Sequence, residues 1–126
     1  MTIEFKERTS IFDVEEGLEF QPKFDSLGLI PVITSSFSNN DILMHGYMNS
    51  EALEKSINSG LAHYWSRSRK CIWKKGETSG LFQKIRVMKI DDDQDCIWIS
   101  VDVSGSGASC HVGYKSCFYR EIVLGN

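Results

Sequence analysis

The sequence predicts a small single domain, residues 1–126, of the α+β class and made mainly of strands. The chain has 126 residues, 41% of them hydrophobic, which is enough for one core without disulfide support. Short apolar segments with β-branched or alternating residues recur along most of it. One clear helix is predicted, between Asn49 and Gly60.

The first two apolar segments, 29–33 and 42–44, predict a pair of strands. Serines and asparagines between residues 35 and 40 separate them, which is typical of a strand, a turn and a second strand. Residues 1–26 are charged and weakly patterned, and the sequence assigns them no role.

The predicted helix has a recognisable start and end. Asn49 is a typical N-cap, and Gly60 is a typical end. Leu53, Ile57 and Leu61 share one face at a spacing of four. The helix is therefore expected to pack on a sheet.

Four further segments complete the expected strands. Residues 63–66 and 71–73 flank a polar turn. Residues 82–90 alternate and then shift phase, which predicts a bulge, and residues 97–103 alternate throughout. Residues 118–124 are expected to form a last strand. Successive strand residues project to opposite sides, so the parity of a position matters for any site.

Charge and composition exclude several classes of protein. The formal net charge of −3 argues against a nucleic-acid partner. The sequence has no apolar stretch of 18 residues, so no membrane span is predicted. The first eight residues lack the apolar core of a secretory signal. We therefore expect a cytoplasmic protein. The four cysteines are then expected to be thiols or metal ligands. Cys71 is expected to be a small buried hydrophobe.

The acidic stretch Asp91-Asp92-Asp93-Gln94-Asp95 is the first candidate site. On an extended backbone Asp91, Asp93 and Asp95 would point one way, and a divalent cation such as magnesium would relieve their repulsion. A solvated acidic turn is the alternative. An EF-hand, with Asp102 at its last position, is excluded because Cys96 occupies the obligatory glycine position and strands replace the flanking helices.

Cys110, His111 and Cys117 form the second candidate site. Thiolate and imidazole suit a softer ion such as zinc. Two cysteines with six residues between them fit a catalytic ion with a third ligand from elsewhere better than a closed structural site. A local disulfide or two buried thiols remain the alternative.

A central polar block, residues 64–69 and 73–80, is the third candidate site. Its arginines, hydroxyls and glycine-flanked turns suit phosphate, and Trp65 and Trp73 offer faces for a base. An exposed strand with its arginines in water is the alternative.

Together these segments resemble the phosphoribosyl-AMP cyclohydrolase family, whose members open the purine ring of phosphoribosyl-AMP with water in histidine biosynthesis. The resemblance covers about residues 24–121. It is carried by GLIPVI, LMHGYMN, EALEKS, HYWSRSR, WKKGETSG, the acidic stretch and GASCHVGYKSCFY.

The resemblance implies an intertwined homodimer with active sites shared between chains, a small nucleotide substrate, and two metals. Asp91, Asp93 and Asp95 match the magnesium ligands, and Cys110 and Cys117 match two zinc thiolates. His111 and Glu77 are the expected catalytic residues. The expected substrate-binding residues are Trp65, Ser66, Arg67, Ser68, Arg69, Lys75, Gly76, Thr78 and Ser79.

The chief departure is Asp92, which stands where the family has its third zinc thiolate. Asp92 is expected to replace that thiolate, and the harder ligand could favour another transition metal over zinc. Cys96 is a second candidate ligand. Smaller departures lie at His45-Gly46, Leu81 and Val112. They leave open a paralogue that hydrolyses another purine- or amidine-like ring, or a non-catalytic metal- or nucleotide-binding protein.

Overall fold

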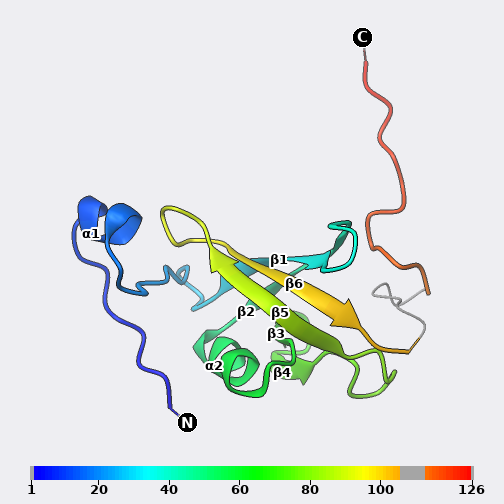
Figure 1. Cartoon of the computed structure of the whole chain (residues 1–126), viewed down its shortest axis with the longest axis horizontal. Helices are drawn as coiled ribbons and strands as arrows, with labels where there is room; N and C mark the ends of the chain where they lie inside the picture. The colour runs from blue at the N-terminus through cyan, green and yellow to red at the C-terminus, as the bar shows by residue number, and fades with distance from the viewer. Residues whose placement is uncertain (1, 106–112, 126) are drawn as a thin grey trace.

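A computed structural model describes residues 2–105 and 113–125 (Figure 1). In its larger sheet the central pair of strands is parallel, and the pair at each edge is antiparallel. The larger sheet has the strand order β2-β1-β6-β5, and β3 and β4 form a separate pair. The elements are α1 (Ile11–Glu16), β1 (Ile30–Ser36), β2 (Ile42–Met48), α2 (Ser50–Ser59), β3 (His63–Ser66), β4 (Cys71–Lys74), β5 (Gln83–Ile90) and β6 (Ile97–Val103).

Strand β1 lies inside the larger sheet, between β2 and β6. It pairs antiparallel with β2 and parallel with β6, with Val32 opposite Ile97. Ile30 and Val32 share one face and are fully buried, whereas Ile33 on the opposite face is 37% exposed. The predicted strand pair is confirmed, and both strands run several residues further than their apolar segments indicated.

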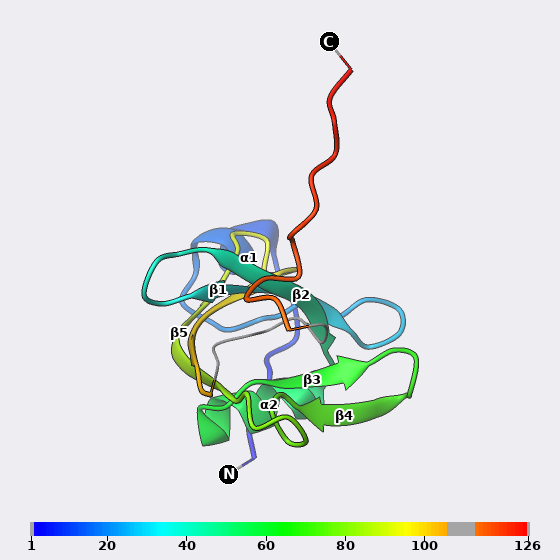
Figure 2. The same cartoon turned by 90° about the vertical axis from the view of Figure 1, so that its right-hand side faces the viewer.

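The predicted helix and both of its ends are confirmed in α2. Oδ1 of Asn49 accepts a 2.8 Å hydrogen bond from the backbone N–H of Ala52, and Gly60 adopts the left-handed conformation at φ 72°. Leu53 is fully buried, whereas Ile57 remains 37% exposed. The helix contacts β2 and β3, so the predicted apolar face is covered only in part (Figure 2).

Tyr64 joins the two sheets inside the core. Its side chain is fully buried, and its hydroxyl bonds Thr34 of β1 at 2.8 Å and Gln83 of β5 at 2.5 Å. Its ring lies so close to Gly46 that a Cβ atom there would stand 2.9 Å from the ring edge. This packing explains the glycine at the His45-Gly46 departure, because any side chain would displace the ring.

The later strands follow the sequence closely until the end of β6. The predicted bulge is confirmed by a register shift between Ile85 and Val87, opposite β6. The last predicted strand is wrong, because residues 118–124 form no strand and run away from the sheet (Figures 1 and 2). Ile122, Val123 and Leu124 are between 80% and 93% exposed.

Two further features differ from the sequence expectation. A second, six-residue helix, α1, begins at the N-cap Ser10 and buries only Val14. Cys71, expected to be buried, is exposed beside the β3–β4 turn. Within residues 2–105 and 113–125, no helix has the length and apolar character needed to cross a bilayer.

Candidate functional site

The acidic residues converge in the loop between β5 and β6, residues 91–96, here called the acidic turn. The backbone N–H of Gln94 bonds the carbonyl of Asp91 at 3.0 Å, and Gln94 itself is left-handed at φ 56°. The ligand atoms of Asp91, Asp93 and Asp95 all lie within 4.8 Å of one another. The predicted convergence is confirmed, but a turn produces it, and the expected extended backbone is wrong.

The pKa values of Asp95 and Asp91 are shifted in opposite directions. Hydrogen bonds with Asp93 and Asp91 raise the pKa of Asp95 to about 6, since its neighbours' negative charges favour the protonated form. Partial burial alone would raise the pKa of Asp91. The hydrogen bonds that its carboxylate accepts from Asp95 and Cys96 outweigh burial and lower that pKa. The turn thus holds negative charge that a cation would stabilise.

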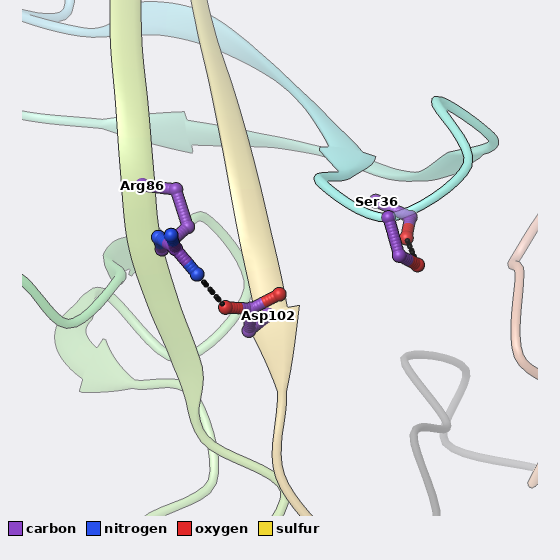
Figure 3. A network of polar contacts seen from close by, with 4 residues as sticks. Ser36, Arg86 and Asp102 are labelled. Carbon is purple, nitrogen blue, oxygen red and sulfur yellow. Dashed lines mark hydrogen bonds and ion pairs between the residues drawn. The ribbon is translucent and has the colours of Figure 1, made fainter.

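The flanking elements confirm that the acidic turn is no EF-hand. Strands β5 and β6 enclose it, and Asp102 lies at the far end of β6. The carboxylate of Asp102 instead pairs with Arg86 across the two strands at 2.7 Å (Figure 3). Both side chains are nearly half exposed, so this ion pair contributes little to stability.

Asp92 and Cys96, the two candidates for the third soft ligand, have different surroundings. Asp92 is exposed, and its Oδ1 accepts a 2.9 Å hydrogen bond from the backbone N–H of Asp93. Cys96 is half-buried, and burial together with the neighbouring carboxylates raises the pKa of its thiol. In the metal-free chain this raised pKa disfavours the thiolate form of Cys96.

The C-terminal residues place Cys117 along the outer edge of β2. Its backbone N–H bonds the carbonyl of Leu43 at 2.7 Å, and the Ser116 hydroxyl bonds the carbonyl of Ile42 at 2.7 Å. Cys110, His111 and the departure at Val112 lie outside the described residues.

The β3–β4 hairpin presents the arginines of the polar block at its tip. The Ser66 hydroxyl accepts a hydrogen bond from the backbone N–H of Arg69 at 3.2 Å, which orders the turn. The guanidinium of Arg67 lies 4.1 Å from the ring centre of Tyr47, and that of Arg69 lies 6.0 Å from that of Trp73. Both arginines are exposed. Aromatic faces thus hold two cations at the surface.

The turn after β4 requires glycine at its start. Gly76 is left-handed at φ 94°, and a Cβ atom there would lie 2.4 Å from the backbone nitrogen of Phe82. The N–H of Glu77 bonds the carbonyl of Lys74 at 3.1 Å, and that of Gly80 bonds the carbonyl of Gly76 at 2.8 Å. Glu77, Thr78 and Ser79 are therefore exposed on a compact turn.

Two of the predicted site residues, Trp65 and Glu77, share one surface cavity of about 430 Å³. The residues that line it are Glu51, Lys55, His63, Trp65, Ile72, Lys74 and Glu77. Sequence reasoning missed His63, Lys74, Glu51 and Lys55 as lining residues. Strand parity could have found His63, which shares a side with Trp65, and the spacing of four could have paired Glu51 with Lys55 on the helix.

The predicted site residues thus fall into separate groups within one chain. The polar block and its cavity surround β3 and β4, whereas the acidic turn lies beyond the opposite end of β5 (Figure 1). The segment after residue 113 lies at the other end of the domain from the acidic turn (Figure 1). Among the residues that the structure describes, one chain does not bring these groups together.

Comparison with known proteins places the same residues in a family. A model of phosphoribosyl-AMP cyclohydrolases matches residues 44–119, which include the polar block and the acidic turn. The chain is 56% identical to a phosphoribosyl-AMP cyclohydrolase of Rhodopseudomonas palustris (strain HaA2) over 110 residues, or 87% of this chain and 74% of that protein.

A second relative gives the same result. The phosphoribosyl-AMP cyclohydrolase of Brucella canis is 51% identical over 110 residues, which cover 87% of this chain and 79% of that protein. The resemblance inferred from the sequence motifs is therefore confirmed. The chain belongs to the phosphoribosyl-AMP cyclohydrolase family, a family of hydrolytic enzymes.

Proposed function

We propose that this protein uses water to open the purine ring of phosphoribosyl-AMP, as a step of histidine biosynthesis. The observation that supports this most is the family match over residues 44–119, which spans both the polar block and the acidic turn. The arrangement of both groups fits a phosphorylated nucleotide and a divalent cation.

The acidic turn would hold a hard cation of the magnesium type through Asp91, Asp93 and Asp95. All three offer carboxylate oxygens within 4.8 Å of one another, the ligand type that such ions prefer. The raised pKa of Asp95 supports this assignment, because hydrogen bonds with the carboxylates of Asp93 and Asp91 raise it most, and a cation would neutralise those carboxylates.

Asp92, Cys110 and Cys117 would hold a second ion, of the zinc type. Such an ion, when bound, acidifies water enough to make hydroxide available near neutral pH. The family resemblance implies a histidine beside this ion, and His111 matches it, so its imidazole would accept a proton from the attacking water. Glu77 shares the cavity of Trp65 and would be a second proton-handling group.

These ligands would come from two subunits of a homodimer, with Asp92 of one chain facing Cys110 and Cys117 of the other. Zinc ligands stand about 2.0–2.3 Å from the ion and therefore lie close to one another. Cys117 is fixed at β2, whereas Asp92 follows β5, and these strands form opposite edges of the sheet. Neighbouring strands are about 4.8 Å apart, so the strand order separates the two ligands within a chain.

The polar block would bind the substrate. Arg67 and Arg69, held over aromatic rings and exposed at the hairpin tip, suit the phosphate, with the hydroxyls of Ser66 and Ser68 beside them. Trp65 offers a face for the base. The residues of the second turn that would contact phosphate and ribose are Lys75, Gly76, Thr78 and Ser79.

A paralogous hydrolase is the second candidate, and Asp92 is the observation that favours it. A carboxylate in place of a thiolate keeps the ligand charge but hardens the site, which changes the preferred metal. A changed metal can accompany a changed substrate, such as another purine- or amidine-like ring.

The test is incubation of the purified protein with phosphoribosyl-AMP while the absorbance of the ring-opened product is followed. Metal content is measured on the same sample, and a chelated aliquot, resupplied with zinc and magnesium separately, serves as the control. Turnover that is lost with chelation and restored by metal supports the proposal. Absence of turnover at full metal occupancy favours the paralogue.

A further inference from the structure

The N-terminal residues 5–24, here called the strap, lie against the acidic turn. Figure 1 shows α1, which belongs to the strap, beside the loop between β5 and β6. The Nη1 atom of Arg8 donates to the carbonyl of Asp93 at 2.8 Å and to that of Gln21 at 3.1 Å. One guanidinium thus joins the strap to the backbone of a proposed metal ligand.

Gln94 makes the more extensive connection. Its side chain is 5% exposed, and its Oε1 accepts a 2.6 Å hydrogen bond from the backbone N–H of Gln21. Its Nε2 donates to the carbonyls of Val14 at 2.8 Å and Glu19 at 3.2 Å. Its own carbonyl accepts from the N–H of Lys23 at 2.7 Å. The centre of the acidic turn is therefore hydrogen-bonded to the strap on several sides.

The strap is itself anchored to the body of the domain. The rings of Phe5 and Phe20 meet edge to face at 5.4 Å, and Phe5 lies 6.0 Å from Phe24. All three rings pack against the main hydrophobic core. The strap therefore connects the hydrophobic core to the acidic turn.

The acidic turn needs such support for two reasons. Gln94 holds a left-handed backbone at φ 56°, which residues other than glycine rarely adopt. Asp91, Asp93 and Asp95 bring their negative charges together, and their repulsion favours an open loop. The four hydrogen bonds of Gln94 to the strap oppose both tendencies.

We propose that the strap, acting through Gln94 and Arg8, positions the carboxylates of Asp91, Asp93 and Asp95 for cation binding. This inference rests on the proposed magnesium site. It goes beyond that proposal because the strap lies outside residues 44–119, which match the family. Gln94 and Arg8 are positioning residues and not ligands, since their contacts are to backbone groups and to the strap.

Positioning works in both directions. If the strap favours the arrangement that binds the cation, the cation must favour the docked strap by the same factor. The backbone N–H groups of Gln21 and Lys23, which bond Gln94, should exchange with solvent more slowly when magnesium is bound.

The test measures magnesium binding to the full-length protein by titration calorimetry, after chelation. Gln94→Met keeps the side-chain volume and removes its hydrogen bonds, and Arg8→Ala removes the exposed contact to Asp93. Gln94→Met loses three side-chain hydrogen bonds and Arg8→Ala loses two, so each variant should bind magnesium at least about tenfold more weakly. Arg8→Lys, which retains a donor, should recover part of the affinity.

Lys6→Ala is the matched control, because it removes the same charge from the same exposed segment without a contact to the acidic turn. Melting temperatures in chelator separate positioning from folding, and Arg8→Ala should leave that temperature unchanged. If Gln94→Met fails to fold, the magnesium affinity of Arg8→Ala alone tests the positioning role.

If Arg8→Ala and a folded Gln94→Met bind magnesium as tightly as the wild type, the strap inference is overturned. The proposed magnesium site is unaffected by that result. If neither the wild-type protein nor Asp93→Asn binds magnesium, both the strap inference and the proposed magnesium site are overturned. Weaker binding by Arg8→Ala with normal binding by Lys6→Ala supports the positioning role.

Discussion

The hydroxyl of Tyr64 donates a 2.5 Å hydrogen bond to Oε1 of Gln83 in the interior of the domain. The same hydroxyl shares a 2.8 Å hydrogen bond with Thr34, so it joins β3 to both β1 and β5. Tyr64 is fully buried, and burial raises the pKa of its phenol above the ordinary value. The hairpin that carries the polar block is therefore held to the main sheet by a neutral, fully bonded phenol.

The first prediction concerns this contact. Tyr64→Phe should lower the free energy of unfolding by about 1–3 kcal/mol, because it removes the hydroxyl that bonds buried polar atoms of Gln83 and Thr34. Urea denaturation of the variant and the wild type measures the difference. Tyr47→Phe, which changes a half-buried tyrosine on β2, is the control and should be nearly neutral. Equal losses in the two variants would contradict the assignment.

The second prediction follows the same tyrosine to high pH. Folding raises the pKa of Tyr64 above its ordinary value of 10.0, so the folded protein holds this proton more tightly than the unfolded chain does. Its contribution to stability is thus complete below about pH 10 and is lost as pH rises further. Wild type and Tyr64→Phe should differ less at about pH 10.5 than at about pH 8 in urea denaturation. An unchanged difference would sink this prediction.

The third prediction separates binding from folding at Arg67. Arg67→Ala should reduce turnover of phosphoribosyl-AMP by more than about tenfold, because one charged hydrogen bond to phosphate is lost. Its exposed contact with Tyr47 contributes only about 0.5–1 kcal/mol, so the melting temperature should change little. Arg86→Ala, at an exposed ion pair, is the matched control and should leave turnover intact. If Arg67→Ala unfolds, Arg67 has a structural role and its assignment to substrate binding is wrong.

The fourth prediction tests the shared metal site by mixing subunits. Asp92→Ala and Cys117→Ser should each be inactive alone. In a mixed dimer one site combines both defects, and the other combines the intact Asp92 and the intact Cys117. After dissociation and random reassociation, activity should recover to about a quarter of the wild type. No recovery, or a monomer in sedimentation with activity intact, would rule out sites built from two chains.

The fifth prediction asks what Asp92 does. If it replaces the missing thiolate, Asp92→Cys should keep or raise the turnover of phosphoribosyl-AMP and increase zinc affinity. Zinc content and turnover are measured together on both proteins, with Cys96→Ala as a control for the neighbouring thiol. Full zinc occupancy without turnover in either protein would select the paralogue.

Local signals in the sequence predicted the local structure well. The caps of α2 were predictable because Asn49 and Gly60 satisfy helix ends through their own chemistry, whatever surrounds them. The bulge in β5 was predictable because it changes which side of the strand each residue faces. Helix α1 was missed because six residues that bury only Val14 leave almost no periodic pattern.

Long-range features were less accessible to sequence reasoning. Residues 118–124 have the composition of a strand, but a strand also needs a partner, and composition does not supply one. The acidic residues converge in a turn through the left-handed Gln94, whose side chain is hydrogen-bonded to the distant strap. Strand parity grouped Asp91, Asp93 and Asp95 correctly, although it assumed an extended backbone where the structure has a turn.

The parallel pairing of β1 and β6 has a consequence for synthesis of the chain. Val32 leaves the ribosome long before Ile97, its partner in the register. Until then β1 can pair with β2 on one side only, and its other edge remains open. An open apolar edge invites pairing with another nascent chain. We therefore expect the protein to depend most on molecular chaperones during the interval between the emergence of β2 and that of β6.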